Sequence, residues 1–227
     1  MPDIQLHYIE KGAGQPLILL HGNGEDCAYF EHQMPCYSKD YRVIAIDTRG
    51  HGQSPRGEKP FSIRQFAEDL HDFMDEQGIG KAILLGFSDG GNIALSFALK
   101  YPEKVEKLIL NGANLFPSGV KARYQWPIEI GYRIAKLFSK KSDEAKHNAE
   151  MLGLMVNEPH INPVDLARLT MPVLVVAGTK DMIKDVHTRL IYKSLPNAQL
   201  SILKGDHFVA NKNYAAFNAA VETFLKE

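Results

Sequence analysis

Gly86-Phe87-Ser88-Asp89-Gly90 is the stretch of this chain that decides its fold, because it matches the pattern G-x-S-x-G. The apolar run 82–85 leads into it and a helical pattern leads out from Gly91, which predicts a strand, a tight turn and a helix. The glycines let the turn close without a Cβ clash, and the strained backbone pushes the serine hydroxyl clear of the sheet edge. We therefore predict that Ser88 is a nucleophile, with a helix N-cap serine as the alternative interpretation.

Short apolar runs alternate with longer amphipathic segments along the rest of the chain. The predicted strands are 4–9, 17–20, 42–46, 82–85, 105–110, 173–177 and 200–203, and the predicted helices are 63–77, 92–101, 187–195 and 214–226. Most of these strands are continuous runs of Val, Ile and Leu, as expected where both faces of a strand are covered. The alternation predicts an α/β fold with a mostly parallel sheet, helices on both of its faces and one domain over 1–227.

One long segment, 115–169, interrupts this alternation with a helical pattern and no convincing strand. Its first part places four large apolar residues on one side of a helix: Trp126, Ile130, Ile134 and Leu137. A second short helix is indicated at 151–155. We predict that 115–169 is a helical lid inserted between two strands, a long insertion by the standard of ordinary loops. Its apolar stripe is expected to pack onto the sheet or to roof a pocket, and these two interpretations are compatible.

A serine hydroxyl needs a base that takes its proton, and histidine is the usual base. His207 is the best placed of the nine histidines, because it follows the last predicted strand and precedes the last predicted helix. The imidazole needs a carboxylate that orients it and stabilises its charged form. Asp181 follows the strand 173–177, at the carboxyl end where sites in α/β sheets are built. We prefer it to Asp185, which lies further along the chain, and to Asp206, which is adjacent to the base.

Four sequence blocks, taken in this order, resemble the α/β-hydrolase superfamily over nearly the whole chain. They are His21-Gly22-Asn23-Gly24, the run Asp47-Thr48-Arg49-Gly50-His51-Gly52-Gln53-Ser54, the turn 86–90, and the pair Asp181 and His207. The resemblance implies an α/β-hydrolase fold and a Ser-Asp-His triad that works by two-step acyl transfer, with no metal and no organic cofactor. It also implies that the backbone N–H groups of Asn23 and Asp89 form the oxyanion hole, with Gly24 as an alternative to Asn23. In this resemblance the block 47–54 is a structural turn without a catalytic role.

The nucleophile turn narrows the choice of reaction. Haloalkane dehalogenases and epoxide hydrolases on the same scaffold use an aspartate at this position, so Ser88 argues against both activities. The run Phe-Ser-Asp-Gly-Gly is similar to that of the valacyclovir-hydrolase-like branch, which handles esters of amino acids. Asp89 is therefore a candidate for binding the cationic group of such an ester. In the alternative interpretation, Asp89 points to solvent or caps the helix.

A carboxylesterase-like serine hydrolase acting on a small-molecule ester is the function that we expect. The first alternative is a C–C bond hydrolase or enol-lactonase on the same triad, for which Arg123 and Arg133 in the segment 115–169 could bind an acidic substrate. The second alternative is a weakly catalytic small-molecule receptor. Labelling by a fluorophosphonate and turnover of a short p-nitrophenyl ester discriminate between an enzyme and a receptor.

Composition restricts the partners and the compartment. Lys and Arg number 26 against 27 Asp and Glu, a net charge of −1, which predicts neither nucleic acid nor a membrane as the main partner. Two cysteines, Cys27 and Cys36, are too few for a disulfide framework and lack the spacing of a zinc site. The chain begins without a signal-peptide pattern and has no apolar run of ~20 residues, so we expect a cytoplasmic protein. The sequence does not predict an oligomeric state.

Overall fold

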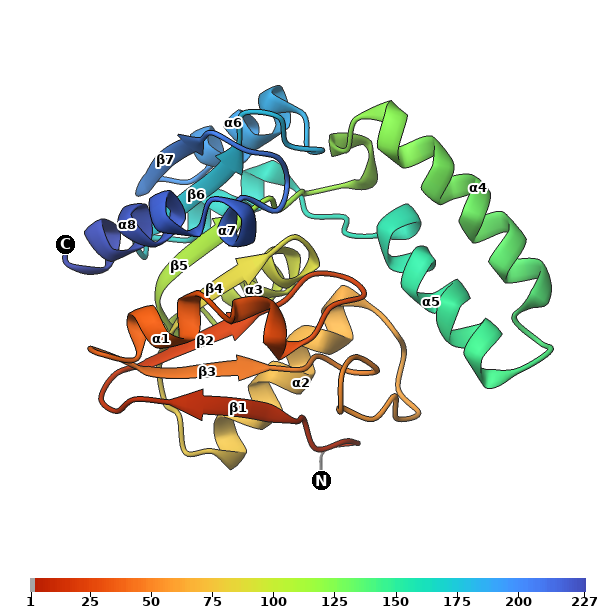
Figure 1. Cartoon of the computed structure of the whole chain (residues 1–227), viewed down its shortest axis with the longest axis horizontal. Helices are drawn as coiled ribbons and strands as arrows, with labels where there is room; N and C mark the ends of the chain where they lie inside the picture. Colours follow the sequence, from red (N-terminus) through yellow and green to blue (C-terminus); the bar gives the residue numbers. More distant parts are fainter. Residues whose placement is uncertain (1–2) are drawn as a thin grey trace.

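A seven-stranded sheet organises the computed structural model, which describes residues 3–227 (Figure 1). Its strands are β1 (Tyr8–Lys11), β2 (Pro16–Leu20), β3 (Arg42–Ile46), β4 (Ala82–Phe87), β5 (Val105–Asn111), β6 (Val173–Gly178) and β7 (Ala198–Leu203). Their order is β1-β3-β2-β4-β5-β6-β7, and every neighbouring pair is parallel except β1 with β3. The predicted α/β fold with a mostly parallel sheet is confirmed.

The first strand is shorter than the sequence pattern predicts. The prediction of 4–9 is wrong at both ends, because β1 begins at Tyr8 and ends at Lys11. Tyr8 pairs with Ile46, which is the last residue of the antiparallel neighbour β3, so a β1 that started earlier would have no β3 residue to pair with. The bounds of the other predicted elements differ by a few residues, as is usual where helices and strands fray.

Helices cover both faces of the sheet. They are α1 (Gln33–Tyr37), α2 (Ile63–Glu76), α3 (Asp89–Lys100), α4 (Ala122–Phe138), α5 (Asp143–Asn157), α6 (Asp185–Ser194), α7 (Val209–Lys212) and α8 (Tyr214–Leu225), with 3₁₀ turns η1 (Cys27–Phe30), η2 (Pro102–Lys104), η3 (Pro117–Gly119) and η4 (Pro163–Arg168). One buried cluster packs α2, α3 and α6 against the sheet, and a second packs α1, α7 and α8 on the opposite face. The predicted covering of both faces is therefore confirmed.

Local sequence explains the elements nearest the nucleophile turn. All six residues of β4 are buried, as its central place in the sheet requires. Helix α2 begins at the N-cap Ser62, whose side chain accepts a hydrogen bond of 3.1 Å from the backbone N–H of Gln65. Its buried residues recur every three or four positions: Ile63, Phe66, Ala67, Leu70, Phe73 and Met74. Helix α2 packs on α3, which follows β4 directly, so a rigid strand and helix flank the turn that carries Ser88.

The segment 115–169 contains η3, α4, α5 and η4, and lies between β5 and β6 in the chain. Figure 1 shows α4 and α5 side by side beyond the carboxyl ends of the strands. The second helix is longer than the predicted short helix at 151–155, since the side chain of Ser142 caps it by accepting from the N–H of Ala145. Two helices thus cover the end of the sheet at which the loops of the parallel strands gather.

The apolar stripe of α4 does not have either of the predicted roles. Its residues Trp126, Ile130, Ile134 and Leu137 are exposed by 68%, 59%, 53% and 79%, so they neither pack on the sheet nor roof a pocket. The opposite side of the helix faces inward, where Gln125 is buried. The predicted helix is correct and the predicted orientation is wrong, because an amphipathic period identifies a stripe without saying which surface covers it.

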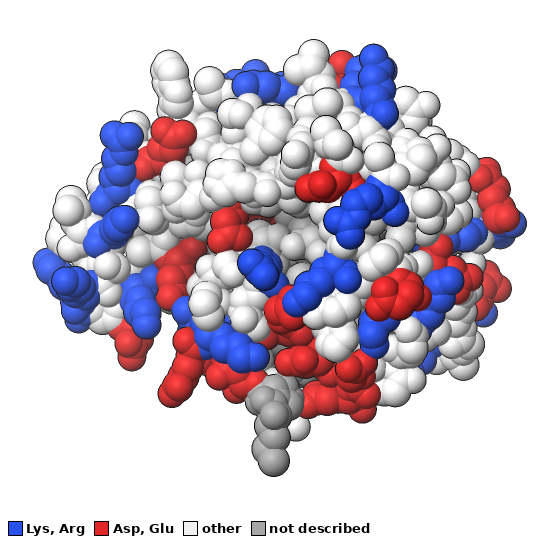
Figure 2. Space-filling view, turned by 180° about the vertical axis from the view of Figure 1, so that it is seen from behind, with Lys and Arg blue, Asp and Glu red and all other residues white. Residues whose placement is uncertain are grey.

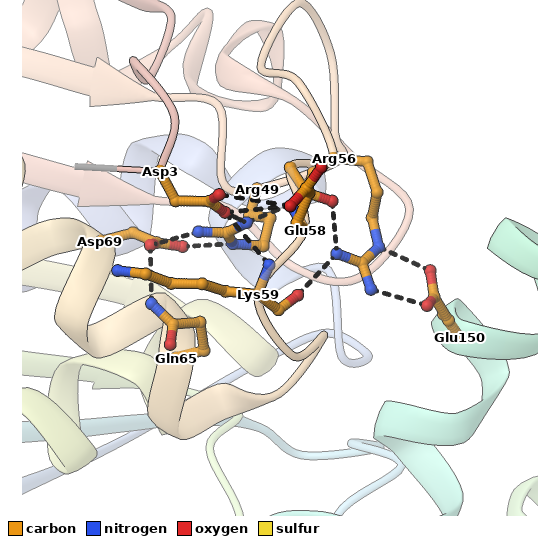
Figure 3. Close-up of polar contacts among 9 residues, drawn as sticks. Asp3, Arg49, Arg56, Glu58, Lys59, Gln65, Asp69 and Glu150 are labelled. Carbon is orange, nitrogen blue, oxygen red and sulfur yellow. Dashed lines mark hydrogen bonds and ion pairs between the residues drawn. The ribbon is translucent and has the colours of Figure 1, made fainter. Parts of the chain in front are cut away.

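Side-chain contacts join α5 to the body of the protein (Figure 3). Arg56 forms a two-pronged ion pair with Glu150 on α5, with both N–O distances at 2.7 Å. Beside it, the fully buried guanidinium of Arg49 donates to both oxygens of Asp69 at 2.6 and 2.7 Å. Glu158, just beyond α5, accepts a 2.7 Å hydrogen bond from the N–H of Ile63 at the start of α2. The contacts of Glu150 and Glu158 thus join α5 and its C-terminal end to the loop after β3 and to the start of α2.

No helix within residues 3–227 combines the length and the apolar character that crossing a bilayer requires.

Candidate active site

The turn between β4 and α3 has the strained backbone that its sequence predicts. Ser88 has φ 53° and ψ −118°, and it is the one residue other than glycine with positive φ in the described part of the chain. A Cβ on Gly86 would lie 2.2 Å from the carbonyl oxygen of Gly90, and a Cβ on Gly90 would lie 2.0 Å from that of Leu20. Both positions therefore require glycine. The N–H of Ser88 donates to the carbonyl of Asn111 on β5 at 2.8 Å, which ties the turn to the sheet.

The structure brings the three residues of the predicted triad together. The Oγ atom of Ser88 lies 3.0 Å from Nε2 of His207, and Nδ1 of His207 lies 2.7 Å from Oδ1 of Asp181. The loop after β7 carries His207, and the loop after β6 carries Asp181. Gly112, at φ 64°, leaves room for the imidazole, because a Cβ there would lie 2.6 Å from its Cε1.

Asp181 is held as a carboxylate although it is only 3% exposed. Burial alone would raise its pKa, but the hydrogen bond and charge of His207 and the backbone N–H groups of Ile183 and Gly178 hold the pKa below 3.8. The two rival aspartates have other partners. Asp206 pairs with Lys212, and Asp185 pairs with Arg189.

The two predicted oxyanion-hole residues, Asn23 and Asp89, both line the cavity at Ser88. Neither backbone N–H has an acceptor within residues 3–227, so both remain able to donate to a substrate oxygen. Their side chains meet, since Nδ2 of Asn23 donates to Oδ2 of Asp89 at 3.0 Å. The other oxygen of Asp89 accepts from Nδ2 of Asn92 at 3.1 Å. Asp89 is 8% exposed, which is incompatible with the interpretation that it points to solvent.

A cavity of about 150 Å³ lies over Ser88. Helix α4 contributes Gln125 and Ile128 to its wall, and α5 contributes Met155. These residues are on the inward sides of the two helices, away from the exposed stripe of α4. Its apolar wall residues are Phe87, Val120, Ile128, Met155, Met182, Ile183 and Phe208. The cavity suits a small molecule with an apolar part.

Comparison with known proteins identifies the family. Residues 15–132, more than half of the chain, match the family described as alpha/beta hydrolase fold. The chain belongs to the α/β-hydrolase family. The predicted resemblance and the predicted fold are both confirmed.

Three similar proteins differ in how much they share with this α/β hydrolase. Epoxide hydrolase 4 of Mus musculus is 37% identical over 111 residues, which cover 47% of this chain and 31% of that protein. Serine hydrolase BPHL of Homo sapiens is 29% identical over 98% of this chain and 84% of its own length. The solved structure of a meta-cleavage product hydrolase from Pseudomonas fluorescens has a TM-score of 0.80 and 27% identity, covering 98% of this chain and 94% of that one. The matches to the first two curated relatives span less than half of those relatives' lengths.

The cavity of this α/β hydrolase carries three carboxyl groups, from Glu25, Asp89 and Glu158, and its wall includes no Lys or Arg. Burial raises the pKa of Glu25 to about 7, against the opposing hydrogen bond from the N–H of Gly22. Burial also raises the pKa of Asp89 and of Glu158, and the two carboxyl groups repel one another. Burial thus favours the neutral forms of these carboxyl groups, and a cation placed beside them would favour their charged forms.

Sequence reasoning missed Glu25 and Glu158. Glu25 follows the block 21–24 directly, and this adjacency was a signal that could have identified it. No local pattern marks Glu158, which reaches the cavity because the chain turns back after α5. The predicted cation sources Arg123 and Arg133 do not reach the cavity, because both lie on the exposed side of α4.

One group of side chains outside the cavity could in principle hold a metal ion. His7, Cys27 and Asp47 place their ligand atoms within 4.8 Å of one another. However, Asp47 already accepts hydrogen bonds from the N–H groups of Cys27 and Gln53 at 2.7 and 2.9 Å and from His7 at 2.8 Å. Burial, followed by contact with Asp47, raises the pKa of the Cys27 thiol to about 12, which disfavours the thiolate that metals bind. This cluster anchors the turn 47–54, in keeping with the structural role that the resemblance implies.

Proposed function

We propose that this α/β hydrolase cleaves small-molecule carboxylic esters through a covalent acyl-enzyme. The observation that carries the proposal is the 3.0 Å contact between Ser88 Oγ and His207 Nε2, on a strained turn that opens into a cavity. A nucleophile and base within hydrogen-bond reach, with the base oriented by a third group, are what activated serine chemistry requires. Asp181 is that third group.

The reaction runs in two steps. Ser88 attacks the ester carbonyl while His207 takes its proton, and the N–H groups of Asn23 and Asp89 donate to the oxyanion. His207 then gives the proton to the leaving alcohol, which departs and leaves the acyl group on Ser88. Water repeats the sequence, with His207 as its base, and releases the acid. Helix α3 adds the partial positive charge of its N-terminus beside the oxyanion.

We propose that the segment 115–169 is the lid of this site, within one domain over 1–227. Gln125 and Ile128 on α4 and Met155 on α5 support this role, because they border the cavity from the side opposite the sheet. The wall that they form excludes part of the solvent from the reacting carbonyl, which strengthens the electrostatic contacts inside.

The preferred substrate in this proposal is the ester of an amino acid. Asp89 supports it, because its buried carboxylate has two neutral amide partners and no cation among residues 3–227. A buried charge without an opposite charge is costly, and the ammonium group of a substrate would relieve that cost. Glu25 and Glu158 line the same cavity, and a bound ammonium group would favour the charged forms of these two buried carboxyl groups.

Other activities of similar proteins fit this cavity less well. A C–C bond hydrolase that acts on a dicarboxylate would need cations to bind the two carboxylates of its substrate. The wall of this cavity has three carboxyl groups and no Lys or Arg, so it does not complement such a substrate. In an epoxide opening, attack by Ser88 would give an ether, which has no carbonyl for water to attack. A receptor without turnover would not need the contact between Ser88 and His207.

The first experiment tests the chemistry. The wild-type protein should hydrolyse p-nitrophenyl acetate and react with a fluorophosphonate, whereas Ser88→Ala should do neither. A folded wild-type sample that fails in both assays would favour the receptor.

The second experiment tests whether the site recognises the ammonium group of an amino-acid ester. The p-nitrophenyl esters of alanine and of propionic acid differ by one ammonium group. Because this group also activates the ester carbonyl, its recognition is measured by comparing the ratio of the two kcat/KM values between the wild type and Asp89→Asn. We expect this ratio to be at least ~10-fold larger in the wild type, since a charge-assisted contact contributes about 1.5–3 kcal/mol. The exposed-site variant Asp143→Asn is the control. Equal ratios in the wild type and in Asp89→Asn would exclude recognition of the substrate's ammonium group by Asp89, while the proposal of ester hydrolysis would stand.

A further inference from the structure

The outer face of α4 carries more of the exposed large apolar side chains within residues 3–227 than any other helix or strand. Residues 126, 130, 134 and 137 are spaced by four, four and three positions, so their side chains form one stripe along the helix. Six of the twelve large apolar side chains that are exposed within residues 3–227 belong to this helix: Tyr124, Trp126, Ile130, Ile134, Leu137 and Phe138. The other six are scattered over the rest of the chain. A contiguous exposed stripe of this kind marks an interaction surface.

Positive charge accompanies the stripe. The segment 121–141 has six Lys and Arg residues against the single acid Glu129, a net charge of +5, whereas the whole chain has −1. The rest of the chain is therefore acidic, with −6. Along the left side of Figure 2, where α4 and α5 lie in this reversed view, blue Lys and Arg side chains lie among white side chains and some red Asp and Glu side chains. The low net charge of the whole molecule conceals a basic segment, 121–141, in which three of the six cations lie on α4 and the other three, Lys121, Lys140 and Lys141, flank it.

These cations are free to meet a partner. The side chains of five of them are exposed: Arg123, Arg133, Lys136, Lys140 and Lys141. Within residues 3–227 the ion pairs of Lys and Arg involve other residues than these five. Three of the five lie instead over aromatic rings of α4, and the closest contact is that of Lys141, just beyond the helix, with Phe138 at 4.4 Å. None of the five is held in an ion pair among the described residues, and the nearest acids in the chain to Lys140 and Lys141 are Asp143 and Glu144 at the start of α5.

We propose that α4 docks this outer face onto an anionic lipid surface. A helix that presents an apolar stripe flanked by Lys and Arg lies in the plane of a bilayer interface, with the apolar side chains inserted and the cations on lipid phosphates and carboxylates. Trp126, at 68% exposure, has the amphipathic ring that is enriched at such interfaces. A second copy of the chain is a poorer occupant, because a symmetric pairing of two α4 helices would bring like charges together.

Docking involves the same helix that borders the cavity. Gln125 and Ile128 face the site, while Trp126 and Ile130 face outward, so the two functions use opposite sides of α4. Binding of lipid to the outer face requires no catalytic residue and does not depend on the proposed ester chemistry.

The test uses Trp126 as its own probe, since it is the only tryptophan in the chain. Its emission is measured as the full chain is titrated with vesicles of phosphatidylcholine alone, or of phosphatidylcholine mixed with phosphatidylserine. We expect a blue shift with the mixed vesicles that weakens as salt is raised, and affinity at least ~10-fold lower for phosphatidylcholine alone.

Paired variants separate the two parts of the surface. Lys140→Gln/Lys141→Gln should weaken binding to the anionic vesicles by about 30-fold, at ~1 kcal/mol for each cation. Ile130→Ser/Ile134→Ser removes two of the apolar side chains that would insert into the bilayer, and it should abolish the blue shift. The matched controls are Lys193→Gln/Lys226→Gln and Val164→Ser, which change exposed residues of the same types away from α4 and should bind as the wild type does.

Three results would overturn the proposal. The first is the absence of a shift with mixed vesicles in a sample whose circular dichroism shows a folded protein. The second is an equal affinity for both vesicle types. The third is a blue shift without lipid that grows with protein concentration, accompanied by a higher sedimentation coefficient, which would identify a second copy as the occupant.

Discussion

Nδ2 of Asn23 donates a 3.0 Å hydrogen bond to Oδ2 of Asp89, and this contact joins the two sides of the proposed oxyanion hole across 66 residues of sequence. The same amide group donates to the carbonyl of Met151 on α5, also at 3.0 Å. One side chain therefore connects the loop after β2, the start of α3 and the proposed lid. We therefore expect the positions of the two backbone N–H donors, those of Asn23 and Asp89, to depend on this hydrogen bond between their side chains.

Asn23→Ala tests this connection. We expect kcat for p-nitrophenyl acetate to fall by about 10-fold, less than the 100- to 1000-fold that the loss of a whole oxyanion donor costs, because the backbone N–H remains but loses its support. Asn92→Ala is the comparison variant, since it removes the other hydrogen bond of Asp89, together with two hydrogen bonds to Asn114, and leaves the loop after β2 untouched. Unchanged kcat in Asn23→Ala would mean that the backbone alone fixes the donor.

Asp181→Asn tests the choice of the third triad residue. An amide at this position would favour the wrong tautomer of His207, and we expect kcat to fall by about 10⁴-fold. Asp206→Asn, at the adjacent rival, should change kcat by less than ~2-fold, because its carboxylate pairs with Lys212 instead. Steady-state assays of both variants at pH 8 discriminate between them. Similar losses in the two would contradict the assignment.

Glu25 gives the protein a pH-dependent stability. Burial raises its folded-state pKa from 4.5 to about 7, so the folded protein holds this proton more tightly than the unfolded chain does. Its contribution to the unfolding free energy is most favourable below pH 4.5 and is lost as the pH rises to about 7. Glu25→Gln should therefore lose less stability than the wild type between pH 5 and pH 8. Urea unfolding at both pH values measures this, with the exposed-site variant Glu76→Gln as the control.

Gly90→Ala tests the packing of the nucleophile turn. The new Cβ would meet the carbonyl oxygens of Leu20 and His21 at 2.0 and 2.6 Å, and backbone atoms cannot move aside as a flexible side chain can. We expect the unfolding free energy in urea to fall by at least ~2 kcal/mol. Gly80→Ala, where no atom lies within 4 Å of the new Cβ, should change it by less than ~0.5 kcal/mol. Equal stability of the two variants would refute the close packing.

Arg56→Gln tests the attachment of α5. Loss of the two 2.7 Å contacts with Glu150 should speed hydrogen exchange of the α5 amides by about 3-fold, a modest change because both side chains are partly exposed. Arg189→Gln removes an exposed pair on α6 and is the control. Exchange that speeds up equally in α5 and in β4 would indicate global destabilisation instead of local loosening.

The sequence by itself determined the parts of this protein that depend on local patterns. Continuous Val, Ile and Leu runs indicate buried parallel strands, and two glycines around Ser88 indicate a strained turn, because these features need only neighbouring residues. The places of Ser88, Asp181 and His207, each shortly after a predicted strand, also selected the three side chains that the fold brings within hydrogen-bond distance. Each of them follows a strand at the same edge of the sheet.

Only the tertiary structure decided which other residues surround the three side chains at the carboxyl edge of the sheet. The contact of Asn23 with Asp89, and the arrival of Glu158 in the cavity, depend on how distant segments pack, which no local pattern encodes. The orientation of α4 was decided in the same way. Its stripe at Trp126 and Ile130 has the period of a buried face, yet it is exposed because α5 and the site occupy the other side of the helix. Periodicity determines that a helix has two faces, and packing determines which face is covered.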